Sequence, residues 1–333
     1  MSLGDAATAR DEKVGKPTMS QPLLPRELAK LPLPGASECD ARRRSRKRRG
    51  RLVAFMAPSF VLVFGLFIVP LLLNVGFAFA DYTSFSRSMS WAGLDNFRTL
   101  LDQEILVNAI RVTVSYALIA MLVQNTVSLI LAIAMQRTTR LIGFFRSAYF
   151  LPVLISPLAA GYIWAAIVSP TGPLNSFIST LISDKFDYSW LGHPFSALAT
   201  VAFIDAWKWS GLITLVYIAG LNAIPTSLLE AAAIDGASTW RRFWSIKFPL
   251  LAPAITFNVV VTFVGAFSAY DIVVATTQGG PGNATRVLNV AMQSQYGQGF
   301  FGTASALSAM VTVLVVVTAI PLVTWLRRRE VYG

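Results

Sequence analysis

Six long apolar stretches, separated by short polar segments, constrain this chain more than any other feature of its sequence. Each is long enough to cross a hydrocarbon core of about 30 Å as a helix. We place the stretches at Leu52–Phe79, Asn108–Met135, Ala148–Val168, Ala197–Leu221, Ala252–Ala275 and Thr303–Trp325. Because lipid cannot hydrogen-bond the backbone, such stretches must be helices rather than isolated strands. The sequence therefore predicts an all-α, polytopic membrane protein with six transmembrane helices.

The composition favours membrane embedding over a soluble fold. Hydrophobic residues make up 54% of the 333 residues and charged residues 14%, whereas soluble domains carry about 25% charged residues. The formal net charge of +11 is not accompanied by a basic recognition fold or an aromatic–basic platform for nucleic acid. In a polytopic membrane protein, excess Arg and Lys are typical of cytoplasmic loops. We therefore expect membrane lipid, and no nucleic acid, as a partner.

The distribution of basic residues between the loops predicts the orientation of the chain. One set of loops and the C-terminus carry Arg137, Arg140, Arg146, Arg241, Arg242, Lys247, Arg327, Arg328 and Arg329. The opposite set carries Arg87, Arg98, Lys185 and Arg286. Because Lys and Arg accumulate on the cytoplasmic side, both termini are expected in the cytoplasm. The loop between the fourth and fifth stretches is then cytoplasmic too.

Three regions are expected along the chain. Residues 1–51 are rich in Pro, Ser and mixed charge, which predicts a disordered cytoplasmic tail. The tail ends in the basic cluster ARRRSRKRRGR, which is typical of a segment that contacts anionic lipid headgroups. Residues 52–326 form the predicted transmembrane domain, and residues 327–333 form a short basic cytoplasmic tail.

The residues for metal binding or side-chain catalysis are scarce. Cys39 is the single cysteine and lies in the N-terminal region, so it can form neither a disulfide nor a cysteine-based metal site within the chain. His193 is the single histidine and precedes a proline in a predicted external loop. We expect it to be a solvated loop residue. The sequence therefore predicts no metal site, no cofactor and no catalytic residue.

One segment carries a spaced motif. Residues 230–249 read EAAAIDGASTWRRFWSIKFP, which follows the pattern E-A-A, three residues, G, nine residues, I-x-L-P. Its fixed points are Glu230, Ala231, Ala232, Gly236, Ile246 and Pro249, with Phe248 where leucine is usual. This segment resembles the cytoplasmic coupling loop of membrane permease subunits in binding-protein-dependent ATP-binding-cassette (ABC) importers.

The same loop, residues 226–250, has a physical reading that is independent of the resemblance. Ser227 and Glu230 have the spacing of a capping box, which predicts a helix start. Gly236 permits a tight turn or a close approach. Trp240, Phe243, Trp244 and Phe248 then recur at helical spacing, and Pro249 is expected to end the second helix. An amphipathic loop that only anchors at the membrane surface would share this pattern.

Further segments extend the resemblance from about Leu52 to the C-terminus. Residues 91–97 (WAGLDNF), 219–225 (AGLNAIP), 233–237 (AIDGA) and 277–285 (TQGGPGNAT) are similar to segments of sugar permeases. They point to the carbohydrate-uptake branch that includes maltose, multiple-sugar and glycerol-3-phosphate permeases. The resemblance is specific for the family and poor for the substrate.

The resemblance implies a type I ABC importer permease fold and a set of partners. These are a cytoplasmic ATP-binding subunit dimer, a second permease subunit that completes a heterodimer, an extracytoplasmic solute-binding protein and a sugar substrate. ATPase coupling would fall to Glu230, Ala231, Ala232, Asp235, Gly236, Ile246 and Pro249. Because the chain lacks a G-x-x-x-x-G-K-[ST] phosphate loop, ATP hydrolysis is expected on the separate subunit, and the chain is not itself expected to be an enzyme. The resemblance places it in the bacterial inner membrane.

The candidates for the substrate path lie in the fourth and fifth stretches. Asp205 and Lys208 share one helix face, and a structural ion pair or interfacial snorkelling explains them better than sugar contact does. The fifth stretch is the better candidate because it combines small residues, aromatic faces, a hydroxyl and a carboxylate. Its candidate residues are Gly265, Ala266, Ser268, Ala269, Tyr270 and Asp271. A purely structural role for Asp271 stays open.

Other functions explain less of the sequence. An ATP-independent secondary carrier predicts inverted repeats and a membrane-buried ion site, and no clear repeat is visible. An intramembrane enzyme needs a convergent set of reactive side chains. An importer permease for a non-sugar solute such as glycerol-3-phosphate remains an alternative to a sugar permease.

Overall fold

The computed structural model describes residues 55–136, 139–182 and 185–328. The predicted tail 1–51 with its basic cluster and Cys39, the predicted tail residues 329–333, and Arg137 lie outside these ranges. Residues up to Ile68 and residues from Val69 onward form two separate compact units. In the first unit, residues 55–68 are helical, with exposed apolar side chains. The cavity and the loop described below belong to the second unit.

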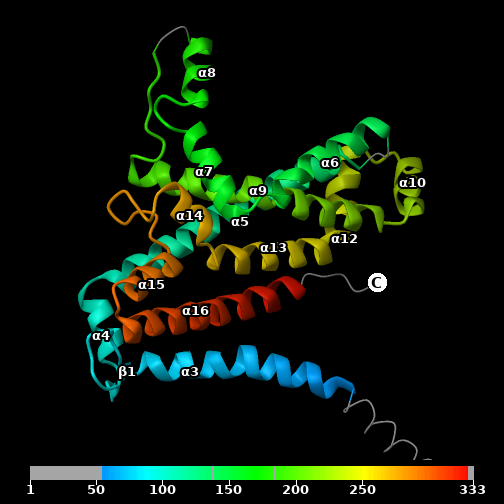
Figure 1. Ribbon diagram of the computed structural model, residues 1–333. Coiled ribbons are helices and arrows are strands. Elements are labelled where there is room, and N and C mark those ends of the chain that lie inside the picture. The colour runs from blue at the N-terminus through cyan, green and yellow to red at the C-terminus, as the bar shows by residue number, and fades with distance from the viewer. Residues whose placement is uncertain (1–54, 137–138, 183–184, 329–333) are drawn as a thin grey trace, which may run out of the picture. The chain divides into compact units, whose positions relative to one another are not determined.

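Helices dominate the described residues (Figure 1). Four are long and apolar enough to cross a membrane: Phe55–Ala78, α5 (Ile105–Ala134), α9 (Pro194–Asn222) and α16 (Phe301–Arg327). The first of them includes η1 (Phe64–Ile68) and α3 (Val69–Ala78). Two bent helix pairs bring the number of possible spans to six. The predicted all-α, six-span class is therefore confirmed. Its one addition is a pair of two-residue antiparallel strands, β1 (Ala80–Asp81) and β2 (Ser90–Trp91).

The third predicted span, Ala148–Val168, is not one continuous helix. It is divided between α6 (Arg140–Leu154) and α7 (Pro157–Ile167), which meet at 102°. A residue that precedes proline disfavours the helical conformation, and Ser156 accordingly adopts an extended ψ of 145°. The Ser156 hydroxyl accepts a hydrogen bond from the amide of Ala159, so it ends one helix and caps the next.

The fifth predicted span, Ala252–Ala275, also required correction. Its helix α13 begins at Ala252 but ends at Phe267, and α14 (Asp271–Thr276) follows as a separate short helix. Tyr270, with φ −149° and ψ −63°, breaks the helix between them. On the other side of Leu251, the loop helices α11 (Thr239–Arg242), η2 (Phe243–Lys247) and α12 (Phe248–Leu250) meet α13 at 65°.

Helix α5 lies at the centre of the second unit and packs against α9 and α13. Small buried residues, among them Ala117 and Ala120, allow close approach of its neighbours. A polar cluster joins the three helices: Tyr217 Oη donates to Asn125 Oδ1 at 2.7 Å, and Asn125 Nδ2 donates to Thr262 Oγ1 at 2.9 Å. Within an apolar protein, this cluster favours one relative alignment of the three helices.

The remaining helices pack outward from this centre and against one another. Helix α16 packs against α3, α13 and α15 (Leu288–Gly297), and α7 packs against α14. Gly161 makes the contact between α7 and α14 possible, because a Cβ at this position would lie 2.5 Å from the Cβ of Ala275. The shorter helices are α4 (Asp95–Asp102), α8 (Pro173–Ile182) and α10 (Thr226–Ile234).

Candidate functional site

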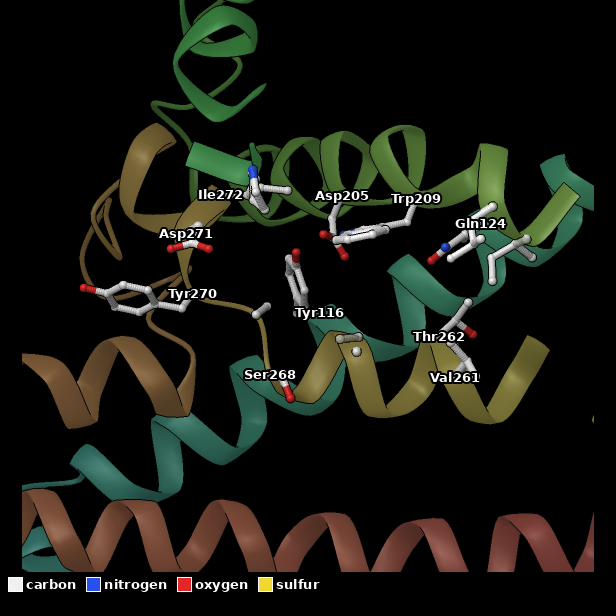
Figure 2. Close-up of a pocket in the computed structure, with 16 residues that line it drawn as sticks. Tyr116, Gln124, Asp205, Trp209, Val261, Thr262, Ser268, Tyr270, Asp271 and Ile272 are labelled. Atoms are coloured by element: carbon white, nitrogen blue, oxygen red, sulfur yellow. The ribbon is translucent and has the colours of Figure 1, made fainter. Parts of the chain in front are cut away.

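A cavity of about 340 Å³ opens between α5, α9, α13 and α14 (Figure 2). This volume falls within the range of small-molecule sites, roughly 300–1,000 Å³. All six residues that the sequence singles out in the fifth stretch line it: Gly265, Ala266, Ser268, Ala269, Tyr270 and Asp271. The structure thus brings these candidates together in one place, and their contact with substrate remains a prediction.

The break between α13 and α14 forms one wall of the cavity. Residues 268–270 connect the two helices: the amides of Ser268 and Ala269 still donate to the carbonyls of Gly265 and Ala266 at 3.0 and 3.2 Å, but carbonyls at the break need other partners. Asn289 on α15 supplies some of them, because its Nδ2 lies 3.2 Å from the carbonyl of Phe267 and 3.4 Å from that of Ala269. Non-helical backbone at membrane depth is tolerated where it is held by protein or lines a cavity. The connection at 268–270 meets both conditions.

The opposite wall comes from α5 and α9. Tyr116 and Gln124 on α5, and Asp205 and Trp209 on α9, line the cavity together with Thr262 of α13. Figure 2 shows Tyr116 pointing across the cavity toward Asp205 and Trp209, with Gln124 and Thr262 toward the other end.

The hydroxyl of Tyr116 is an unusual group in this wall. The Tyr116 side chain is fully buried, and its oxygen lies against the carboxylate of Asp205. No hydrogen bond of good geometry reaches this oxygen. The Asp205 carboxylate is also within reach of Trp209. A polar pair of this kind, with unused hydrogen-bonding capacity, faces the space that a solute would fill.

Lys208 does not form the direct ion pair with Asp205 that its spacing suggested. Its ammonium donates instead to the carbonyl of Val153 at 3.3 Å and lies 3.9 Å from the ring centroid of Trp209. In a continuous helix, the Val153 carbonyl would accept from the amide at position 157, which is a proline and has no N–H. Lys208 therefore satisfies a carbonyl that the α6–α7 break exposes.

The predicted coupling loop, residues 226–250, forms a second candidate surface. Helix α10 ends in a Schellman motif: the amide of Gly236 donates to Ala233 at 3.1 Å and that of Ala237 to Ala232 at 2.9 Å. Gly236 has a φ of +77°, which glycine adopts without strain. The glycine is thus required by the turn, and the space around the position of its missing Cβ is open within this chain.

Two local expectations for the loop were wrong. The capping box of Ser227 and Glu230 is absent, because α10 already begins at Thr226 with Pro225 at its N-cap and no side-chain cap. The fixed φ of Pro225 restricts the backbone at the helix start, but its ring makes no capping hydrogen bond. Pro249 does not end the second helix, which continues to Leu250. Pro249 lies in the last turn of this helix, which runs from Thr239 to Leu250.

The aromatic residues of the loop cluster as their helical spacing predicts. Trp244 contacts Trp240, Phe243 and Phe248, with ring centroids 5.0–5.6 Å apart. The cluster is anchored to the rest of the protein by Lys247, whose ammonium donates to Gln136 Oε1 at 3.0 Å.

The predicted coupling residues lie on the outside of the loop. Glu230, Ala231, Asp235 and Gly236 are exposed, and Ala232, Ile246 and Pro249 are half-buried. Two large apolar neighbours are also exposed: Ile234 at 87% and Trp240 at 72%. A surface with this composition is available to a partner, and its role in coupling remains a prediction.

Residues 124–330 match the family described as the binding-protein-dependent transport system inner membrane component. The chain belongs to this family. Within it, this permease is 34% identical to the sn-glycerol-3-phosphate transport system permease protein of Agrobacterium fabrum, over 84% of this chain and 95% of the relative. It is 29% identical to a probable starch degradation products transport system permease protein of Thermoanaerobacterium thermosulfurigenes, over 83% and 94%.

A third relative and a solved structure extend the comparison. The permease is 29% identical to the trehalose/maltose transport system permease protein of Thermococcus litoralis, over 80% of this chain and 89% of the relative. Its fold resembles a chain of a bacterial ABC transporter involved in the import of the acidic polysaccharide alginate, with a TM-score of 0.73 at 21% identity, over 86% and 98% of the two chains. The predicted importer permease fold is therefore confirmed.

The sequence reasoning missed half of the cavity. Tyr116, Gln124 and Thr262 were not among its candidates, although each is polar within an apolar helix. That feature is itself a signal, since polar groups inside membrane spans usually face a cavity or a partner. The face on which each of them lies depends on how α5, α9 and α13 pack.

Proposed function

We propose that this permease forms one half of the pathway for a sugar or related carbohydrate across the bacterial inner membrane. The cavity at the α13–α14 break carries the proposal, because it places hydroxyl, carboxylate, amide and aromatic groups together inside an apolar protein. Such groups suit the hydroxyls and the apolar faces of sugars. The names of two relatives, for starch degradation products and for trehalose and maltose, support the same substrate class.

Transport is coupled to ATP hydrolysis through a partner subunit that docks on residues 226–250. In this proposal, the loop contacts one subunit of a cytoplasmic ATP-binding dimer. The contacting residues are Glu230, Ala231, Ala232, Asp235, Gly236, Ile246 and Pro249. Both termini are then cytoplasmic, in line with the basic loops. ATP hydrolysis takes place on that dimer, since the permease has no phosphate loop of its own.

The loop has two mechanical connections to the cavity. First, α12 leads across Leu251 directly into α13, which lines the cavity. Second, the hydrogen bond from Lys247 to Gln136 ties the loop to the end of α5, which contributes Tyr116 and Gln124. A rigid-body displacement of the loop would therefore move two walls of the cavity together, which is how packed helices transmit motion.

Two further partners complete the transporter. A second permease supplies the other half of the pathway, and an extracytoplasmic binding protein delivers the solute. One solved neighbour of similar fold is a bacterial alginate ABC transporter in complex with an alginate pentasaccharide-bound periplasmic protein, which supports the second of these partners.

The coupling part of the proposal is tested by Glu230→Ala. The variant should abolish solute uptake in a strain that lacks the native gene, and the ATP-binding subunit should no longer co-purify with the permease. Asp102→Ala, at an exposed acidic residue outside the loop, serves as the matched control and should leave both unchanged. Unchanged uptake in Glu230→Ala would reject coupling through this loop.

A panel of mono-, di- and oligosaccharides and sn-glycerol 3-phosphate, given to the same strain, identifies the solute. Glycerol-3-phosphate is the second candidate, because the relative at 34% identity is named for it. A loss of sugar uptake in the knockout supports the first candidate, and a selective loss of sn-glycerol 3-phosphate uptake supports the second.

A further inference from the structure

The charges around the cavity are distributed unevenly. Among the described residues, its lining includes two carboxylates, Asp205 and Asp271, and no Lys, Arg or His. The nearest cation on the same helix, Lys208, is held by the Val153 carbonyl on one side and the face of Trp209 on the other. Its ammonium offsets part of the acidic charge, but it does not itself line the cavity. An anionic solute would therefore meet carboxylates directly and find no cation to pair with.

The pair formed by Tyr116 and Asp205 has a definite hydrogen-bonding preference. An ionised carboxylate only accepts hydrogen bonds, whereas a phenol both donates and accepts. A solute hydroxyl matches both groups, because it can donate to Asp205 while it accepts from Tyr116. A carboxylate or a dianionic phosphate group can accept from Tyr116, but it has no proton to offer Asp205 and is repelled by its charge.

The state of Tyr116 adds an independent reason to expect a ligand at this point. Its oxygen is fully buried and has no hydrogen-bond partner of good geometry. A buried polar group without a partner destabilises the protein, so a hydroxyl of this kind is retained where something else requires it. Figure 2 shows it directed into the space between α5 and α9, where a solute group would meet it.

We propose that Tyr116 and Asp205 act as a hydroxyl-selective pair, which makes this half of the pathway specific for uncharged polyhydroxylated solutes and unfavourable for organophosphates and uronates. This inference rests on the proposed function and narrows its substrate class. Asp271 contributes to the same selection from the other side of the cavity, since it is exposed at the start of α14. The preference follows from the residues of this chain and does not depend on the binding protein.

Saturation-transfer NMR on the full transporter in detergent tests the inference with matched probes. Glucose, glucose 6-phosphate and glucuronate share a ring and differ in charge. The parent protein should bind glucose at least tenfold more tightly than either anion. Tyr116→Phe should weaken glucose binding by about fivefold, and Asp205→Asn should reduce the discrimination against the anions at least tenfold. Tyr162→Phe and Asp95→Asn, at exposed positions outside the cavity, are the controls and should match the parent.

A stability measurement separates this role from a merely structural one. Tyr116→Phe removes an oxygen that makes no hydrogen bond of good geometry, so its melting temperature should equal or exceed that of the parent while its affinity for glucose falls. A structural role predicts a lower melting temperature instead.

The inference is overturned if the anions bind as tightly as glucose, if no probe binds, or if both variants bind like the parent. None of these results affects the coupling test with Glu230→Ala. Failure of selectivity and failure of the proposed importer mechanism are therefore distinguishable.

Discussion

The ammonium of Lys247 donates a hydrogen bond of 3.0 Å to the side-chain oxygen of Gln136 and so joins the predicted coupling loop to the end of α5. The two residues are 111 positions apart in the sequence. Arg146 of α6 meets the same turn, because its guanidinium donates to the carbonyl of Met135. The end of α5 is thus held from two directions.

Removal of the first contact should uncouple the transporter. Lys247→Met should lower uptake several-fold while ATP hydrolysis by the partner falls much less, because the loop would still dock but would no longer move α5. Lys247→Arg should restore most of the uptake, since it can donate to the same oxygen. Both rates are measured on the reconstituted transporter. Equal losses of uptake and ATP hydrolysis in Lys247→Met would argue against this linkage.

The cluster of Tyr217, Asn125 and Thr262 should contribute measurably to stability. Asn125→Ala removes two interhelical hydrogen bonds and leaves the buried Tyr217 hydroxyl without its partner. We expect a loss of about 1–2 kcal/mol in the free energy of unfolding, in the upper part of the range for such bonds in membranes.

A double-mutant cycle with Tyr217→Phe provides the check for that cluster. The two losses should not add, because each substitution breaks the same hydrogen bond. Unfolding in a denaturing detergent measures the loss of unfolding free energy in each variant, with Thr312→Val at an exposed position as the control.

A comparison of Gly236→Ala with Gly282→Ala distinguishes the backbone role of Gly236 from a role in docking. Both Gly236 and Gly282 have positive φ, +77° and +54°, and open space around the position of a Cβ. Alanine should therefore cost about 1–2 kcal/mol at either position through backbone strain alone. Only Gly236→Ala should also reduce co-purification of the ATP-binding subunit. Equal co-purification of the two variants would remove Gly236 from the docking surface.

Gly211 marks a close approach of α9 to α6. A Cβ at this position would lie 2.8 Å from the carbonyl of Tyr149 and 3.1 Å from the Cα of Phe150, so the helices would have to separate. Gly211→Ala should destabilise the protein by about 1–3 kcal/mol. Gly143→Ala is the matched control, because it lies in a helix with open space around it and should raise stability by up to about 1 kcal/mol. Thermal unfolding in detergent compares the two.

The predicted spans agree with the structure wherever a helix runs straight. Asn108–Met135 and Thr303–Trp325 lie within a few residues of α5 and α16, because apolar length alone identifies a membrane helix. The two spans that failed contain breaks at Ser156 and at residues 268–270. A hydropathy pattern carries no information about a bend, since both halves of a broken span are equally apolar.

The candidate site was predictable in part for a related reason. The six residues of the fifth stretch are consecutive or nearly so, and a local pattern of small, aromatic and polar types is enough to single them out. Tyr116 and Asp205 are 89 positions apart, and the α5–α9 contact places one against the other. No local pattern contains that contact.

The sequence by itself determined the membrane class, the number of possible spans and the spacing of the loop motif, because these depend on apolar length and on residues close together in the chain. Tertiary structure alone decided that Lys208 holds the Val153 carbonyl, that Lys247 reaches Gln136, and that the Tyr116 oxygen lies against the Asp205 carboxylate. Each of these depends on the distance and rotation between packed helices. Those quantities arise from the fit of small residues and buried polar groups at helix contacts, which a one-dimensional pattern does not encode.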